Sequence, residues 1–203
     1  MATRAHRAPI GLALWLGFAL TAHAQAPVPV TDVNRVEHLV LATNKTSAMQ
    51  TEINESADAG YRFMGVMGGE TAFGGSEVIV IMTRTTDAAP RFRYRLLATS
   101  KTSTMQKEMQ DANDAGFEYR GQTVFKSTFG GQEAVVILER DLRAQESRRF
   151  EYLLLATSKT STMQEELRAA GEAGFEFVGV TVASTRFGGN EVVSILRRPI
   201  ERP

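Results

Sequence analysis

One short polar motif occurs three times in the chain and contains the residues best suited to chemistry. It combines hydroxyl side chains with a lysine just before a predicted helix, at Lys45-Thr46, Lys101-Thr102 and Lys159-Thr160. Free backbone amides and the dipole at a helix N-terminus attract anions, and a lysine adds a positive charge. The motif therefore predicts a binding site for a small anionic ligand. No nucleotide-binding glycines precede the lysines, which argues against nucleotide hydrolysis.

The same loops also have a purely structural interpretation. Each carries the pattern Ser-x-x-Gln, which is typical of a capping box, and the serines are Ser47, Ser103 and Ser161. In a capping box the serine oxygen accepts a hydrogen bond from an amide of the first helical turn, and the glutamine reaches back to the serine amide. Capping explains the serines but leaves the three lysines unexplained.

A second repeated group is a glutamate in the pattern Phe-Gly-Gly-x-Glu, at Glu77, Glu133 and Glu191. Three such carboxylates would hold a cation if they met, but a solvated residue after a turn is the commoner role. The chain has no cysteine, which excludes thiol catalysis and cysteine-based metal sites. We expect no enzymatic activity, metal or cofactor. A hydrolase that uses a pair of carboxylates stays an open alternative, because a sequence does not show their separation.

Residues 1–24 resemble a secretory signal peptide. Arg4 and Arg7 precede an apolar stretch, and Ala22-His23-Ala24 matches the usual cleavage pattern. An uncleaved N-terminal anchor is the alternative. We expect a periplasmic or secreted protein with no membrane span after cleavage near Ala24. The whole chain has a formal net charge of zero, which argues against a nucleic-acid partner.

The rest of the chain contains three copies of one unit. The string LLATSKTSTMQ begins at Leu96 and again at Leu154, and VLATNKTSAMQ begins at Val40. The units extend over residues 37–84, 93–140 and 151–198, and residues 25–36 form an extended lead-in. A recurring period of this kind indicates a repeat architecture in place of one ordinary domain.

Each unit has the pattern of a β-α-β-β fold. A short apolar run predicts the first strand, and a helix follows it with an apolar stripe marked in the first copy by Met49, Ile53 and Ala57. The stripe continues in the other copies as Met105, Met109, Ala112, Met163, Leu167 and Ala170. A glycine ends each helix, and a second one inside the following strand predicts a bulge or a close approach, at Gly65, Gly121 and Gly179.

The third strand of each unit is apolar at consecutive positions, which predicts burial on both faces. That strand therefore belongs in the middle of a three-stranded sheet of order 1-3-2, described here as mixed, with the first two strands parallel and the third antiparallel between them. The predicted class is α+β. One helix covers only one face of each sheet, and a unit of this size rarely makes an adequate core alone. We therefore expect the three sheets to pack on one another.

The third copy resembles the small bacterial domain family DUF4177. The resemblance rests on Tyr152, on the Gly174-Phe175-Glu176 string and on the closing apolar strand that ends in basic residues at Val192–Arg198. The second copy matches through Tyr94 and Gly116-Phe117-Glu118. This resemblance implies a compact α+β fold and no particular activity.

Two functions follow from these observations. The first is a secreted, non-enzymatic binding module that uses the repeated lysine loops to hold a small anionic ligand. The second is a structural or assembly protein of the cell envelope, whose open strand edges would pair with another protein.

Overall fold

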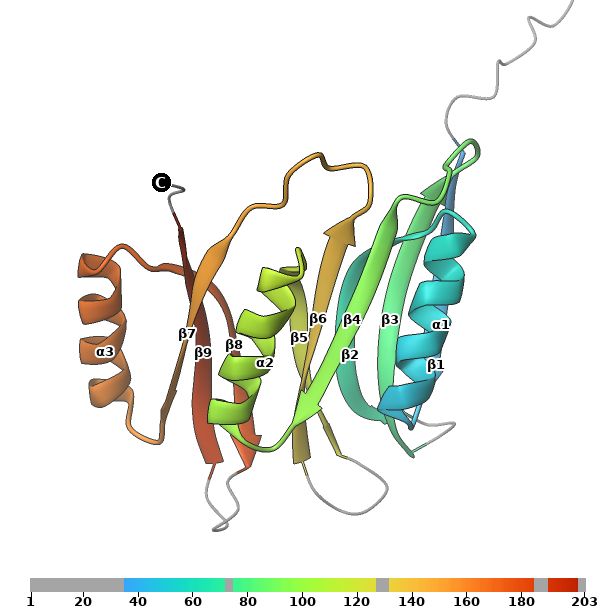
Figure 1. The fold of residues 1–203 in the computed structure, drawn as a ribbon. Coiled ribbons are helices and arrows are strands. Elements are labelled where there is room, and N and C mark those ends of the chain that lie inside the picture. Colours follow the sequence, from blue (N-terminus) through green and yellow to red (C-terminus); the bar gives the residue numbers. More distant parts are fainter. Residues whose placement is uncertain (1–34, 72–74, 127–131, 185–189, 201–203) are drawn as a thin grey trace, which may run out of the picture. The chain divides into compact units, whose positions relative to one another are not determined.

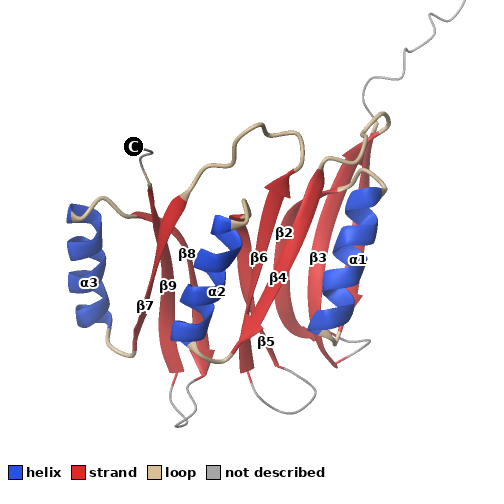
Figure 2. Ribbon diagram, in the orientation of Figure 1, coloured by secondary structure: helices blue, strands red, loops and turns tan. Residues whose placement is uncertain are grey.

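The computed structural model describes residues 35–71, 75–126, 132–184 and 190–200, which form three similar units (Figure 1). Unit 1 contains β1 (Val36–Thr43), α1 (Thr46–Asp58), β2 (Arg62–Thr71) and β3 (Gly75–Thr85). Unit 2 contains β4 (Phe92–Thr99), α2 (Thr102–Asp114), β5 (Glu118–Lys126) and β6 (Gln132–Asp141). Unit 3 contains β7 (Phe150–Thr157), α3 (Thr160–Glu172), β8 (Glu176–Ser184) and β9 (Asn190–Pro199). Figure 2 shows this alternation, and the predicted α+β class and repeated element order are confirmed.

Several predictions concern residues outside this description. They are the signal segment at 1–24, nearly all of the lead-in at 25–36, and the Phe-Gly-Gly turns apart from Gly75. Gly75 has φ 76°, the positive value that the predicted turn requires. Among the described helices, none is long and apolar enough to cross a membrane.

Each unit forms one three-stranded sheet, and the predicted strand order is confirmed. The orders are β1-β3-β2 (sheet A), β4-β6-β5 (sheet B) and β7-β9-β8 (sheet C). The predicted strand directions are confirmed as well, because the third strand of every sheet pairs antiparallel with both of its neighbours. The first and second strands run parallel but are not paired with each other, so the sheets are antiparallel and the term mixed does not apply. Each sheet therefore has two edge strands, of which one is the first strand of its unit.

The start of each helix differs from the predicted capping box. Helix α1 begins at Thr46 with Lys45 as its N-cap, and the Lys45 side chain makes no capping hydrogen bond. The Thr43 hydroxyl accepts a hydrogen bond of 3.2 Å from the Lys45 amide and so closes the turn after β1. The other two units repeat this arrangement. The predicted caps Ser47, Ser103 and Ser161 already lie inside the helices, so the predicted N-cap is wrong by two residues in each unit.

The two predicted roles for glycine are confirmed. Gly60 follows α1 with φ 88°, and the Tyr61 amide donates to the Ser56 carbonyl, which is the hydrogen bond of a Schellman motif. A bulge interrupts the second strand of every unit, between Phe63 and Gly65 in β2 and at the equivalent positions of β5 and β8. The bulge reverses which side chains face the helix, so it determines what the second strand presents on each face.

The described residues form two hydrophobic cores, and each contains residues of two consecutive units. The first core combines Met49 and Ile53 of α1 with Val80 of sheet A and with Tyr94 and Ile137 of sheet B. The second core combines α2 and sheet B with sheet C in the same way. A helix thus packs on its own sheet with one side and on the next sheet with the other. In Figure 1 α2 lies between β4 and β7.

The two outer units depart from the predicted burial. The third strand is buried on both faces in β6, where Val136 and Ile137 are both almost fully buried, but β3 exposes Ile81. In α3 only Ala170 of the predicted stripe is buried, whereas Met49, Ile53, Met105 and Met109 are fully or almost fully buried. Burial of the third strand on both faces is therefore confirmed for β6 and β9 and wrong for β3. The physical reason is position, because among the described residues no unit precedes unit 1, which contains β3, and none follows unit 3, which contains α3.

Candidate functional site

The predicted lysine loops lie at the ends of β1, β4 and β7, each directly before its own helix. The lysines are all exposed, and so is Thr160, whereas Thr46 and Thr102 are partly buried. Within the described part of the chain, no ion pair or hydrogen bond joins one of these loops to another. Each loop belongs to a different unit, and the starts of α1, α2 and α3 lie apart in Figure 1, so the structure does not bring Lys45, Lys101 and Lys159 together.

The alternative acidic site receives no support from geometry. Glu77, Glu133 and Glu191 lie on the third strands of three different sheets. Over residues 35–200, leaving aside the three hairpin tips, no group of three or more acidic, histidine or cysteine side chains is placed to hold a metal ion. His38 lies on the exposed outer face of β1, away from any such group.

The most distinctive polar contacts lie between units, where helix α1 covers the free edge of β4. The Asn54 side chain accepts a hydrogen bond from the Tyr94 amide and donates one to the Tyr94 carbonyl, both at 3.0 Å. Gln50 donates to the same carbonyl at 3.0 Å and accepts from the Leu96 amide at 2.6 Å. An amide side chain offers one donor and one acceptor group, so it satisfies a strand edge as a neighbouring strand would.

Helix α2 covers the edge of β7 in the same manner. Gln110 donates to the Phe150 carbonyl and accepts from the Tyr152 amide, both at 3.1 Å. Gln106 accepts from the Leu154 amide at 3.0 Å, and Asn113 accepts from the Phe150 amide at 2.7 Å. The asparagine and glutamine side chains of each helix thus bind the strand edge of the next unit. The Gln of the Ser-x-x-Gln pattern has this role and does not close a capping box.

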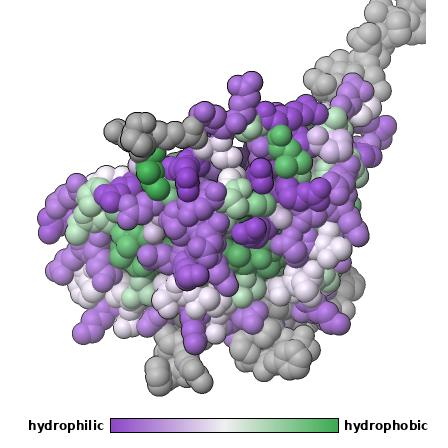
Figure 3. All heavy atoms as spheres, viewed as in Figure 1, coloured by the Kyte–Doolittle hydropathy of each residue, from purple (hydrophilic) through white to green (hydrophobic). Residues whose placement is uncertain are grey.

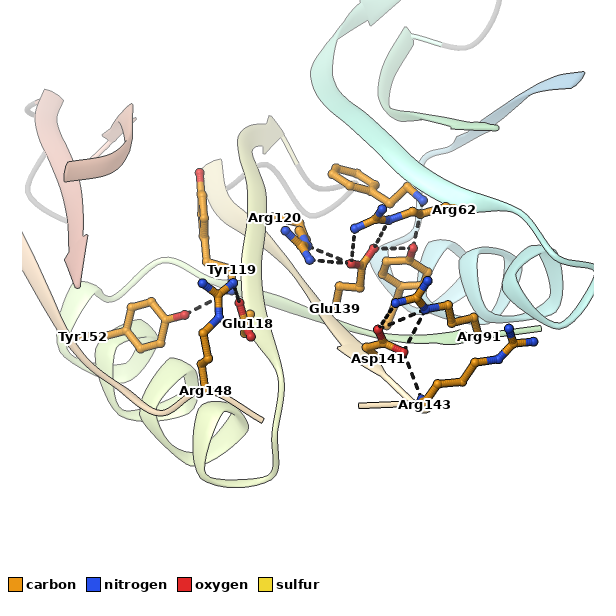
Figure 4. A network of polar contacts seen from close by, with 12 residues as sticks. Arg62, Arg91, Glu118, Tyr119, Arg120, Glu139, Asp141, Arg143, Arg148 and Tyr152 are labelled. Atoms are coloured by element: carbon orange, nitrogen blue, oxygen red, sulfur yellow. Dashed lines mark hydrogen bonds and ion pairs between the residues drawn. The ribbon is translucent and has the colours of Figure 1, made fainter. Parts of the chain in front are cut away.

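A buried carboxylate reinforces the first contact between units (Figure 4). Glu139 of β6 is 2% exposed, and its oxygens accept from Arg62 of unit 1 at 3.1 Å and from Arg120 at 2.7 Å. The Tyr94 hydroxyl donates to Glu139 at 2.7 Å and accepts from the Phe63 amide at 2.9 Å. Since two guanidinium groups and a phenol already occupy this carboxylate, its geometry is that of a structural ion pair.

The second contact repeats the tyrosine but exchanges the charges. The Tyr152 hydroxyl accepts from the Tyr119 amide at 3.1 Å, as Tyr94 does from Phe63. However, Arg197 stands where Glu139 stands in unit 2, and Glu118 stands where Arg62 stands in unit 1. Burial raises the pKa of the Tyr152 phenol, and burial together with Tyr152 raises that of Tyr119 to about 12. Each contact therefore has its own charge pattern, which distinguishes the two contacts.

Exposed apolar side chains gather on the two end faces of the series. The first, called here the N-face, is the side of sheet A that points away from α1, together with the bulge of β2: Val36, Val40, Met64, Met67 and Ile81. The second, called here the C-face, is the outer side of unit 3, and its exposed members on β8 are Phe177, Val180 and Val182. These eight are most of the large exposed hydrophobic residues that the structure describes. The helix-bearing side in Figure 3 is mainly hydrophilic with separate apolar patches.

Equivalent residues are buried wherever a neighbouring unit covers them. Ile81, Ile137 and Ile195 share one position, and they are 36%, 0% and 2% exposed. Phe63 is 6% exposed, whereas Phe177 at the same position of unit 3 is 54% exposed. The end faces therefore expose, at equivalent positions, apolar side chains that a neighbouring unit covers elsewhere in the described chain. Aligning the three copies and comparing the outer one with the middle one would have indicated both faces.

Comparison of the chain with protein families, with curated proteins and with solved structures finds no match. The resemblance to DUF4177 accordingly stays a prediction.

Proposed function

We propose that the chain is a non-enzymatic protein-interaction module of the cell envelope. Its tandem units stack in series, each helix covering the next sheet, and the two end faces of the stack bind protein. The observation that carries this proposal is the exposure of Ile81 beside two buried isoleucines at the same position. Contiguous apolar patches rimmed by polar residues are typical of protein interaction sites. This corresponds to the assembly function expected from the sequence, acting through faces as well as strand edges.

The envelope location in this proposal rests on the predicted signal segment. A periplasmic or secreted protein without cysteine has no disulfide to stabilise small units. Burial of apolar surface between units then supplies that stability. The fold therefore depends on sheet and helix faces that associate with a neighbouring unit. The buried Glu139 is occupied by its own partners, so it is not available as a catalytic acid or base.

Photo-crosslinking tests the proposal directly. A photoreactive phenylalanine analogue replaces Val40 on the N-face or Phe177 on the C-face, and the chain is irradiated in the cells that produce it. We expect defined adducts from both positions. The same analogue in place of Lys107, whose side chain is 81% exposed on α2 and lies on neither end face, is the control and yields none. Absence of adducts from both end faces would refute the proposal.

The lysine loops support a second candidate function, the binding of small anions. The observation that favours it is the absence of a side-chain cap at the start of all three helices, beside an exposed lysine. The first-turn amides of these helices are then available to an anion. Loss of anion-dependent stabilisation after replacement of the lysines tests this function.

A further inference from the structure

The two end faces correspond to the two halves of the contact that joins consecutive units. The C-face presents the surfaces of α3 and β8 that, as α1 and β2, pack on unit 2. The N-face presents the sheet surface that, in sheets B and C, receives the preceding unit. Both halves are present once in every chain, and both are exposed. A second copy of the chain therefore carries the surface that fits each end.

The glycines of the bulges show how closely the two halves fit. A Cβ atom at Gly121 would lie 3.1 Å from the Phe63 ring and 3.3 Å from Val66 Cγ1, so the absence of a side chain there admits the preceding strand. Gly179 admits Tyr119 and Gln122 in the same way. At Gly65, the equivalent position of the N-face, nothing lies within 4 Å. This position is the empty counterpart of an occupied slot.

The C-face carries the side chains that would fill this slot. Phe177 and Val180 occupy in unit 3 the positions that Phe63 and Val66 occupy in unit 1. They are 54% and 48% exposed, and Phe63 is almost fully buried where its slot exists. The apolar side chains Phe177 and Val180 are thus present on the C-face, and the glycine against which they would pack, Gly65, is present on the N-face.

Polar groups at the two ends are complementary as well. Gln164 of α3 stands where Gln50 and Gln106 bind the next strand edge. The matching edge of β1 at His38 and Val40 has no partner among the described residues. Asp58 and Asp114 end their helices in ion pairs with an arginine at the start of the next unit, Arg93 and Arg149. Glu172 of α3 and Arg35 before β1 occupy the positions of Asp114 and Arg149, whereas the position of Arg93 is Glu37 in unit 1.

We propose that the chain associates with itself head to tail, the C-face of one copy covering the N-face of the next. This inference rests on the proposed function and names the partner. Because the two faces differ, the contact is heterologous, and it produces a ring if the rotation closes or a filament if it does not. The internal contacts between units supply the geometry, so the assembly continues the repeat series from one chain into the next.

Engineered cysteines test the direction of the contact, since the chain contains none of its own. The contact of Gly121 with Val66 places Gly65 of one copy against Val180 of another. The Gly65→Cys and Val180→Cys chains are purified as the cells produce them, whether or not the N-terminal segment has been cleaved. The two chains are then mixed and oxidised. We expect a covalent dimer from the mixture, none from either variant alone, and a ladder of multiples from the double variant.

A blocking variant provides a second measurement. Gly65→Arg has open space within its own chain, so its circular dichroism spectrum stays that of the original protein. In sedimentation experiments over a dilution series, we expect the mass of the original protein to exceed that of one chain at least twofold, and Gly65→Arg to sediment as one chain. Arg35→Glu or Glu172→Arg alone weakens the association, and both together restore it.

The outcomes separate this inference from the proposed function. Disulfides that form only between identical variants would indicate a symmetric interface and overturn the head-to-tail contact. A single-chain mass, with photo-adducts to a different protein, would overturn self-association and leave the proposed function standing. Adducts within one chain, between Val40 and residues before 35, would overturn the head-to-tail contact, because the chain then covers its own N-face. A single-chain mass without any adduct would overturn both self-association and the proposed function.

Discussion

The contact between helix amides and the next strand edge gives a sharp prediction for Gln110→Ala. The substitution removes two hydrogen bonds, one to the Phe150 carbonyl and one from the Tyr152 amide. Each contributes about 1 kcal/mol net, and the strand groups left behind are half-buried. We therefore expect the free energy of unfolding to fall by about 2 kcal/mol. For a chain of this size, that lowers the melting temperature by about 4–8 °C.

A matched control lies at the same position of unit 3. Arg168→Ala changes the residue of α3 that corresponds to Gln110, where no following strand exists in the described chain. It removes an exposed ion pair with Glu172, which is worth about 0.3–0.5 kcal/mol. Gln and Arg have similar helix propensities, so the gain from alanine cancels between the two variants. The comparison therefore isolates the bonds to the strand edge.

The assay is urea unfolding followed by circular dichroism, performed on dilute protein so that association between copies does not contribute. We expect Gln110→Ala to lower the midpoint clearly and Arg168→Ala to leave it almost unchanged. Gln110→Glu keeps the side-chain length but faces the Phe150 carbonyl with a carboxylate, and it should be at least as destabilising as alanine. Equal losses for Gln110→Ala and Arg168→Ala would refute the conclusion that helix amides hold consecutive units together.

Four further predictions follow from the same structure. Glu139→Gln lowers the free energy of unfolding by about 1–3 kcal/mol, since its two arginines stay partly solvated, whereas the same change at the exposed Glu151 has a much smaller effect in the urea assay. Burial raises the pKa values of the Tyr94, Tyr119 and Tyr152 phenols above the unfolded value of about 10. The stabilisation from these neutral phenols is therefore complete below about pH 10 and is lost as the pH rises further. Phenolate absorbance that rises before the circular dichroism signal falls would contradict this prediction. In acid, hydrogen bonds from Arg91 keep the pKa of Asp141 below its ordinary value, so stability present above about pH 4 declines as the pH falls further, and Asp141→Asn makes this decline shallower in an acid titration. Finally, replacing the loop lysines by glutamine leaves the melting temperature in anion-free buffer unchanged and removes its rise with phosphate or sulfate; a rise that persists would exclude Lys45, Lys101 and Lys159 from anion binding.

The local structure of each unit could be predicted because its signals are short-range. Gly60 must follow the helix, since only glycine adopts its φ of 88° without strain. Consecutive apolar residues in β6 placed that strand in the middle of its sheet. The capping box could not be judged in this way, because the Ser-x-x-Gln glutamine has a long-range partner. In α1 that partner is Leu96, 46 residues further along the chain.

The sequence by itself determined the repeat, the β-α-β-β order of each unit and the strand order of its sheet. These depend on periodicity, on turn residues and on propensities, which act between neighbouring residues. Only the tertiary structure decided that a helix stands between consecutive sheets and that amide side chains cover the strand edges. It also decided which copies of an equivalent residue are buried, as with Ile81 and Ile137. The physical reason is that burial depends on which surface lies opposite, and residues with the same local sequence have different neighbours at the ends of a series.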